Sequence, residues 1–229
     1  MTFSRDNQQL LPLSHGLMTE FNNFIAFEPH KPIIHHLKNF KQGERIYLYG
    51  EKSTGCSHLA KASCVYHQSL QSIYLPLSTL KFLDRSMLEG VAQIDLICVE
   101  DIDHLAGNQS QQLILFDLIN ICVSHNISML ITAHIKPQRM ECWLPDLRTR
   151  LQAMCNWEMP TLSDDDKAKI LIDWLKKQNM SLDIDVIHYA FKHVDRDLSV
   201  IKALLESFLK HCMKVKKGAN IRSLREFLS

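Results

Sequence analysis

Short apolar runs rich in β-branched and aromatic residues alternate with helical patterns along most of this chain, and this alternation constrains the fold more than any other feature. Five runs are predicted strands: RIYLYG, SIYLPL, DLICVED, SMLITAH and a weaker NWEMP. Strands separated by helices usually pair in parallel, because each helical crossover returns the chain to the same end of the sheet. The sequence therefore predicts an α/β fold, with a mostly parallel five-stranded sheet and flanking helices.

The pattern changes after Pro160, where the predicted strands stop. Ser163, with Asp166 three residues later, resembles a capping box and predicts a helix over KAKILIDWLKKQ. Two more helical stretches follow, IDVIHYAFKHV and DLSVIKALLESFLKHCMK, and the basic run KVKKGANIR is typical of a solvated helix end. We therefore divide the chain into a flexible tail (residues 1–20), an α/β domain (21–160) and a small all-helical domain (161–229).

The loop after the first predicted strand resembles a phosphate-binding loop. In YGEKSTGCSHLAKA, Gly50, Gly55 and Ser57 match the pattern G-x-x-x-x-G-K-S/T, but Cys56 stands at the lysine position. A helix is predicted over residues 57–71, so backbone N–H groups and the helix dipole converge on this loop. The thiol removes a cation and leaves these donors, which predicts nucleotide binding without hydrolysis. A glycine-bounded turn with no ligand is the alternative.

Two predicted strands end in polar residues at the edge where open α/β sheets bind ligands. Glu100 and Asp101 follow the third strand, where carboxylates hold Mg²⁺ and orient water in nucleotide-binding sheets. The alternative is a buried strand that simply exits into solvent there. Thr132 and His134 end the fourth strand, and His134 by itself fits a partly exposed strand-end histidine better than a catalytic one.

Two arginines follow these strands. A turn and a short helix separate the fourth strand from Arg150, in LPDLRTRLQ. Arg196, in HVDRDLSVIK, is predicted to begin a helix. Arginine suits the stabilisation of a transferring phosphoryl group, on the same protein or on a neighbour. For either residue alone, a surface salt bridge is the simpler explanation.

The order of these features resembles that of AAA+ proteins, and within them the DnaA-related regulators of replication initiation. The resemblance rests on FNNFIAF (residues 21–27), LYGEKSTGCSHLAKA, LPDLRTRL, LSDDDK and VDRDLSVI. It implies an AAA+ phosphate-loop fold with a helical lid and a site for ADP, with or without Mg²⁺, or for no nucleotide if the loop is degenerate. The implied nucleotide-binding residues are Gly50, Gly55, Cys56, Ser57, His58, Glu100, Asp101, Thr132 and Arg196.

Two departures from the family pattern also argue against hydrolysis at this site. Glu100 followed by Asp101 reverses the usual order of Asp and Glu, and His134 replaces an acidic residue. By the resemblance, Arg150 is instead an arginine finger that acts in trans on ATP bound to DnaA. The implied function is a regulator that stimulates this hydrolysis and so inactivates the initiator, rather than a stand-alone enzyme.

The resemblance also implies a second partner for the protein, bound through the N-terminal segment QQLLPL. Gln8, Leu11, Pro12 and Leu13 resemble the peptide by which such regulators bind the DNA polymerase III sliding clamp, its β subunit, and the peptide's extended form suits a groove. The two residues between Gln8 and Leu11 depart from that peptide. A tail whose leucines pack on the protein's own surface is the alternative.

Charge and composition limit the other possibilities. Lys and Arg number 26 against 25 Asp and Glu, a net charge of +1, whereas DNA-binding domains usually carry a basic excess. The seven cysteines form no C-x-x-C pair, and the histidine pairs lack helical ligand spacing, so we expect reduced thiols and no metal. Without an apolar signal core or a run of 18 apolar residues, we expect a cytoplasmic protein that binds no membrane.

Two other functions stay open on the sequence alone. A self-contained AAA+ ATPase, such as a helicase-loader-like protein, would use Glu100 or Asp101 to activate water. A DNA-binding fragment of an initiator would bind duplex DNA with a strong salt dependence. The near-neutral charge and the lack of a helix-turn-helix domain after the predicted lid lead us to expect no specific DNA binding.

Overall fold

The computed structural model describes residues 19–67, 70–76 and 90–228, and five strands in this part form one sheet. The strands are β1 (Arg45–Tyr49), β2 (Ser72–Pro76), β3 (Leu96–Glu100), β4 (Ser128–Ala133) and β5 (Cys155–Glu158). Their order is β2-β3-β4-β1-β5, and every neighbouring pair is parallel. The predicted α/β class and all five predicted strands are confirmed. Their carboxyl ends meet at one edge of the sheet.

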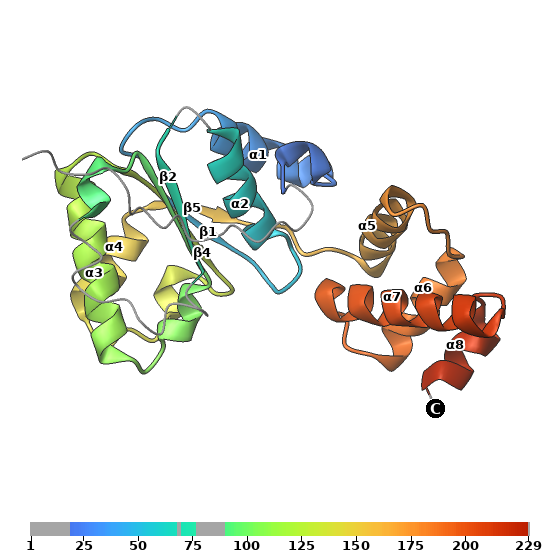
Figure 1. Cartoon of the computed structure of the whole chain (residues 1–229). Coiled ribbons are helices and arrows are strands. Elements are labelled where there is room, and N and C mark those ends of the chain that lie inside the picture. Colours follow the sequence, from blue (N-terminus) through green and yellow to red (C-terminus); the bar gives the residue numbers. More distant parts are fainter. Residues whose placement is uncertain (1–18, 68–69, 77–89, 229) are drawn as a thin grey trace, which may run out of the picture.

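Helices cover both faces of this sheet (Figure 1). On one face lie α1 (Lys31–Lys38) and α2 (Cys56–Tyr66), and on the other α3 (Gln109–Ser124) and α4 (Pro145–Gln152). The loops contain short 3-10 helices, among them η1 (Phe21–Asn23), η2 (Glu28–His30), η4 (Ile102–Leu105) and η5 (Pro137–Arg139).

Side chains of the central strands alternate between two hydrophobic cores. In β1, Ile46 and Leu48 pack in the core beside α1 and α2, whereas Tyr47 packs in the core beside α3 and α4. In β4, Leu130 joins the first core and Met129 the second. Because these strands are buried on both faces, their sequences are continuous apolar runs rather than alternating ones.

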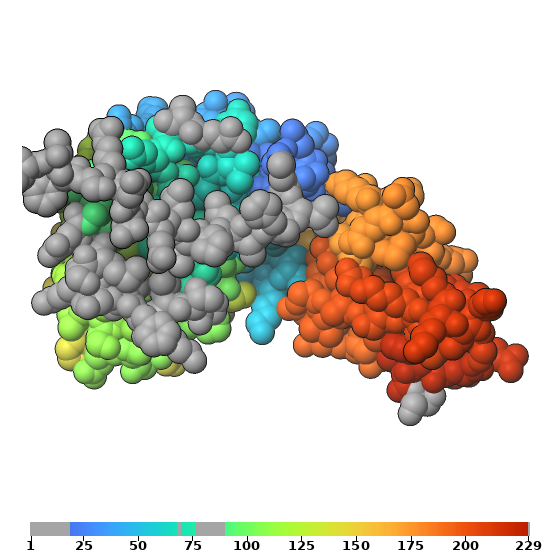
Figure 2. All heavy atoms as spheres, in the orientation of Figure 1, coloured from blue at the N-terminus to red at the C-terminus, as the bar shows by residue number. Residues whose placement is uncertain are grey.

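Four helices follow the sheet: α5 (Asp164–Lys177), α6 (Ile184–His193), α7 (Leu198–Val215) and α8 (Ile221–Leu228). They form a separate lobe, in which α5 lies next to the N-terminal segment of the α/β lobe (Figures 1 and 2). The cores of this lobe begin at Ala168, and those of the sheet end at Met159. This separation supports a boundary near residue 160, although the exact domain limits stay a prediction.

The predicted cap of α5 is present. The Ser163 hydroxyl accepts a hydrogen bond from the Asp166 backbone N–H (3.1 Å) and donates one to the Asp166 carboxylate (2.7 Å). In the described part of the chain, no helix combines the length and apolar character needed to cross a membrane.

Two helix predictions need correction. The helix predicted over residues 57–71 begins at Cys56 and ends at Tyr66, because His67 leaves the helical conformation and its Nε2 hydrogen-bonds with the carbonyl of Leu37 (3.0 Å). Helix α8 was not predicted. It has only eight residues, of which Leu224 alone is buried, and it begins inside the run KVKKGANIR, which the sequence analysis interpreted as a solvated helix end.

Candidate functional site

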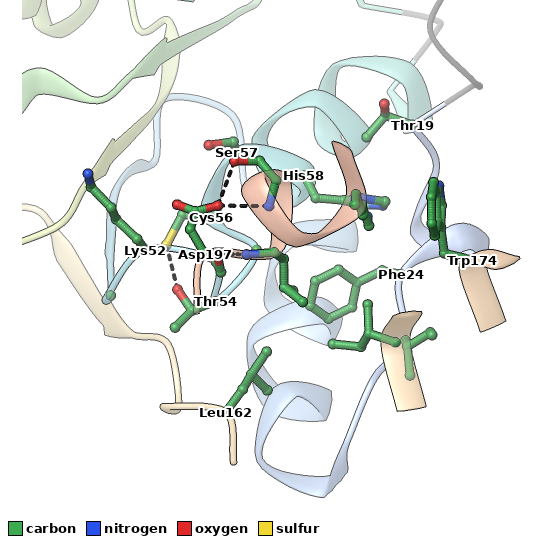
Figure 3. Close-up of a pocket in the computed structure, with 18 of the residues that line it drawn as sticks. Thr19, Phe24, Lys52, Thr54, Cys56, Ser57, His58, Leu162, Trp174 and Asp197 are labelled. Atoms are coloured by element: carbon green, nitrogen blue, oxygen red, sulfur yellow. Dashed lines mark hydrogen bonds between the residues drawn. The ribbon is translucent and has the colours of Figure 1, made fainter. Parts of the chain in front are cut away.

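A cavity of about 780 Å³ lies between the carboxyl edge of the sheet and the helical lobe (Figure 3). Its walls come from the N-terminal segment around η1 and η2, the loop of residues 50–58, the ends of β3 and β4, and helices α5 and α7. A volume of this order is typical of small-molecule and cofactor sites. The fold therefore places the predicted phosphate loop in the wall of a cavity large enough for a nucleotide.

The loop between β1 and α2 is fixed at both ends. The Gly50 N–H donates to the carbonyl of Ala133 (3.2 Å), which joins the loop to the end of β4. Gly55 precedes α2 with a φ of +99°, a conformation that favours glycine. A Cβ at Gly55 would lie 2.5 Å from the ring of Phe24, which lies in the cavity between the loop and the helical lobe (Figure 3). The backbone shape that an anion-binding loop needs thus depends on this glycine.

Cys56, at the lysine position, is the first residue of α2 and is buried. Its Sγ lies 3.7 Å from the hydroxyl of Thr54 (Figure 3). Burial raises the pKa of the Cys56 thiol to about 12, so the thiol is neutral near pH 7. The loop keeps its backbone donors and the helix N-terminus but has no cation at this position.

Replacing Cys56 with lysine is expected to tighten ATP binding by roughly tenfold, and ADP binding by less, because the added ammonium group meets the extra phosphate. Calorimetric titration of both nucleotides against the wild type and the variant measures the change. Cys56→Met is the matched control, since it lengthens the side chain without charge. Negligible affinity for both nucleotides before and after the lysine substitution would contradict a nucleotide site at this loop.

The residues after β3 and within β4 divide into those that line the cavity and those that do not. Asp101 lines it, and the Asp101 backbone N–H donates to the hydroxyl of Thr132 (3.1 Å). Thr132 is fully buried, and Glu100 accepts a hydrogen bond from the hydroxyl of Tyr74 on β2. Neither Glu100 nor Thr132 lines the cavity. The structure therefore brings Asp101 alone of these three to the site, and nucleotide contact by the other two stays a prediction.

His134, directly after β4, lines the cavity with a partner that the sequence analysis missed. The Asp103 carboxylate accepts hydrogen bonds from His134 Nδ1 (2.7 Å) and from its backbone N–H (2.6 Å). The bond to Asp103 raises the pKa of His134 although burial opposes this. The signal was available: the acidic residues Asp101 and Asp103 both follow the third strand, and only the first was considered.

Ser57 and His58 continue α2 and also line the cavity. His58 Nε2 hydrogen-bonds with the carbonyl of Glu20 (2.9 Å), and its ring packs edge-on against Phe24 with a centroid distance of 5.3 Å. Burial lowers the pKa of His58. His58 thus joins the phosphate loop to the N-terminal segment, and its predicted contact with nucleotide stays a prediction.

The helical lobe, which the resemblance implies as a lid, supplies wall residues that the sequence analysis did not name. Lys202 Nζ lies 5.7 Å from the ring centre of Trp174, and burial together with the charge of Lys177 lowers the pKa of Lys202. The backbone N–H of Leu198, at the start of α7, donates to the hydroxyl of Ser53 in the loop (2.8 Å). The loop and the helical lobe therefore meet directly at the cavity.

The position predicted for Arg196 was wrong in one respect. Helix α7 begins at Leu198 rather than at Arg196, because the Asp197 carboxylate caps it by accepting a hydrogen bond from the Ser199 backbone N–H (2.7 Å). The Arg196 guanidinium pairs with Asp164 (3.4 Å) and does not line the cavity. A role for Arg196 in nucleotide binding stays a prediction.

Arg150 lies in the last turn of α4, away from the cavity. Its side chain is exposed and has no hydrogen-bond or ion-pair partner in the described part of the chain. Arg148 differs: its Nη2 donates to the carbonyl of Met140 (3.2 Å), and its Nε is buried. Residues two apart on a helix point about 200° apart, so of these two arginines Arg150 is the one available to another molecule.

Four predicted partner-binding residues cannot be placed. The clamp peptide residues Gln8, Leu11, Pro12 and Leu13 all lie outside the described residues.

One group of possible metal ligands in the described ranges, His36, Glu44 and Cys155, lies apart from the cavity. His36 Nδ1 accepts a hydrogen bond from the indole N–H of Trp157 (2.7 Å), so the neutral ring carries its proton on Nε2, which faces Glu44 (2.7 Å). A ring nitrogen that carries a proton cannot bind a metal. This arrangement fits a hydrogen-bond chain rather than a metal site.

Comparison with known proteins gives one family. The model of the bacterial DnaA ATPase domain matches residues 20–158. An uncharacterized protein of Haemophilus influenzae is 27% identical over 187 residues, which cover 80% of this chain and 81% of that protein.

Solved structures give the same fold. Domain III of the Thermotoga maritima replication initiation protein DnaA has a TM-score of 0.77 at 18% identity, covering 91% of this chain and 95% of its own. AMPPCP-bound DnaA from Aquifex aeolicus has a TM-score of 0.66 at 20% identity, covering 83% of this chain and 65% of its own. These likenesses confirm the predicted AAA+ fold of the DnaA type.

Proposed function

The chain belongs to the family of bacterial DnaA ATPase domains, and from this premise we propose that it regulates the initiation of chromosomal replication in the manner of Hda, the DnaA-related regulatory inactivator. In this proposal the protein binds the sliding clamp through its N-terminal peptide. It then presents Arg150 to ATP bound on DnaA, and the resulting hydrolysis leaves the initiator in its inactive ADP form.

The state of Arg150 is the observation that carries this proposal. The guanidinium of an arginine finger that acts in trans must have no ion-pair or hydrogen-bond partner in its own protein, and it must lie outside that protein's own nucleotide site. Arg150 meets both conditions in the described structure, because its guanidinium is exposed and unpaired there and does not line the cavity. A guanidinium in this state suits the charge that develops on a phosphoryl group during transfer.

The chain's own cavity supports nucleotide binding more than hydrolysis. The loop offers backbone donors at the N-terminus of α2, while the buried thiol of Cys56 supplies no charge to the outer phosphates. DnaA structures similar in fold hold AMPPCP, an adenine nucleotide analogue. We therefore assign ADP, with or without Mg²⁺, to this cavity, with Gly50, Gly55, Ser57 and Asp101 among its contacts.

Hydrolysis of ATP preloaded on DnaA tests the function. We expect hydrolysis to accelerate only when this protein and the sliding clamp are both present, and we expect the protein alone to show no turnover. Turnover by the protein alone would favour the self-contained ATPase. Tight, strongly salt-dependent binding to duplex DNA, without any effect on DnaA, would favour an initiator fragment.

Changing Gln8 and Leu11 to alanine is expected to weaken clamp binding by roughly tenfold to a hundredfold, because a few anchors dominate the affinity of a short peptide. The thermal transition should not change, since an extended tail contributes little to a core. Gel filtration with purified clamp measures the binding, and Gln9→Ala is the matched control because Gln9 departs from the peptide pattern. A loss of folding in the double variant would show that QQLLPL is structural.

A further inference from the structure

Two carboxylates lie near the place of the missing lysine. Asp101 lines the cavity, and Asp103 lies in the adjoining η4. Besides burial, the charges of both carboxylates raise the pKa of the Cys56 thiol, which places them close to the lysine position. A nucleotide phosphate bound at the loop would therefore face two carboxylates and a neutral thiol. Lys52, Lys177 and Lys202 line the same cavity, and a further cation beside these carboxylates would strengthen the binding of a phosphate there.

His134 is the neighbouring group best placed to supply that cation. It follows Ala133, whose carbonyl accepts the hydrogen bond from Gly50 at the start of the loop (3.2 Å). Asp103 fixes the ring through His134 Nδ1 (2.7 Å) and holds the backbone N–H with the same oxygen (2.6 Å). The other ring nitrogen, Nε2, has no partner among the residues that the structure describes, and the side chain is one-third exposed at the cavity wall.

We infer that the imidazolium of His134, held by Asp103, replaces the missing lysine and donates a hydrogen bond from Nε2 to a nucleotide phosphate, so that binding strengthens as the pH falls. The inference rests on the proposed nucleotide site and names its phosphate-binding cation. It also makes the occupancy of that site sensitive to pH in the range where histidine titrates.

The other histidines of the cavity are poorly suited to this role. His30, His58, His104 and His134 all line the cavity. Burial lowers the pKa of His30 and of His58, which disfavours the charged form of both rings. His104 is exposed in η4. Only His134 combines a carboxylate partner with a position directly after Ala133, beside the start of the loop.

The charges around His134 set the sign of the pH dependence. Asp103 in η4 and Asp101 after β3 favour the charged ring, whereas burial and Lys52 in the loop oppose it, and the net effect raises the pKa of His134 above its usual 6.5. Tyr47 of β1, close to Asp103, stays neutral because burial raises its pKa. The cation therefore forms as the pH falls through this raised pKa and is lost as the pH rises through it.

Titration of the full-length protein with ADP at about pH 6 and about pH 8 tests the inference. ADP itself gains a proton in this range, so the quantity to compare is the ratio of wild-type affinity to that of His134→Gln. We expect this ratio to be roughly tenfold to a hundredfold at the lower pH and to approach one at the higher pH. His104→Gln, which removes another histidine of the same cavity, should match the wild type at both.

A second variant keeps the test independent of the histidine's packing. Asp103→Asn preserves size and removes the charge, so the His134 ring should titrate at a lower pH when followed by NMR, and the pH dependence of ADP binding should shift with it. A wild-type to His134→Gln ratio that is the same at both pH values would overturn the inference and leave the nucleotide site standing. No ADP binding by the wild type at either pH would overturn both.

Discussion

Replacing Arg150 with alanine is expected to lower the stimulated hydrolysis of DnaA-bound ATP by about a thousandfold or more, the scale typical of arginine fingers supplied in trans. The guanidinium is exposed and unpaired within the described structure, so its loss should leave the fold unchanged. Clamp binding and ADP binding should also persist, because the charge is needed only in the transition state. Single-turnover hydrolysis of labelled ATP on DnaA measures the effect, and gel filtration and ADP titration measure what is retained.

Two other arginines serve as controls for this result. Arg139 is exposed on η5, which packs against α4, so Arg139→Ala removes the same charge nearby and should keep nearly full stimulation. Arg148→Ala should instead destabilise the fold by about 1–3 kcal/mol, because it removes the hydrogen bond to Met140 from a partly buried guanidinium. If folded Arg148→Ala protein loses stimulation and Arg150→Ala does not, the assignment of LPDLRTRL is wrong. If neither matters while stimulation persists, the trans-finger mechanism is wrong.

The sheet could be predicted from the sequence because its signal is local. All five residues of β3 are buried, so the run LICVE is apolar almost to its end, and Gly or polar residues separate such runs along the chain. The start of α7 could not be predicted in the same way. Asp195 and Asp197 are both possible caps, and both accept backbone hydrogen bonds (3.1 Å and 2.7 Å). The structure shows that Asp197 is the cap of α7, and the Leu198 N–H beside it also donates to the hydroxyl of Ser53, a tertiary contact that the sequence does not reveal.

The part of the site that lies in the loop could also be predicted, because its signal is local too. The glycines of the loop and Cys56 lie within a few residues of one another, so their pattern is visible in the sequence. Trp174 and Lys202 come from a lobe whose place at the cavity is set by tertiary packing. Glu100 and Asp101 could not be separated in advance, because Glu100 ends β3 whereas Asp101 leaves the strand with a left-handed φ of +55°, a local geometry that the sequence does not reveal.

Replacing Gly55 with alanine is expected to lower the free energy of unfolding by roughly 2–5 kcal/mol. Two causes add. The φ of +99° strains any residue with a Cβ, and that Cβ would lie 2.5 Å from the ring of Phe24, which must move. Because the same substitution displaces the loop's backbone donors, ADP binding should fall with stability. Urea denaturation and ADP titration at a temperature where the variant is folded measure the two effects separately.

Gly218→Ala is the matched control for Gly55→Ala, since a Cβ there meets nothing nearer than the Asn220 side chain at 3.7 Å and the backbone has no unusual φ. It should change stability by less than about 1 kcal/mol. Combining Gly55→Ala with Phe24→Leu separates the two causes: the smaller side chain should recover the part due to overlap, while the part due to φ persists. If Gly55→Ala behaves like Gly218→Ala in both stability and ADP binding, the loop is not held in the anion-binding shape, and the nucleotide site proposed for this cavity loses its main support.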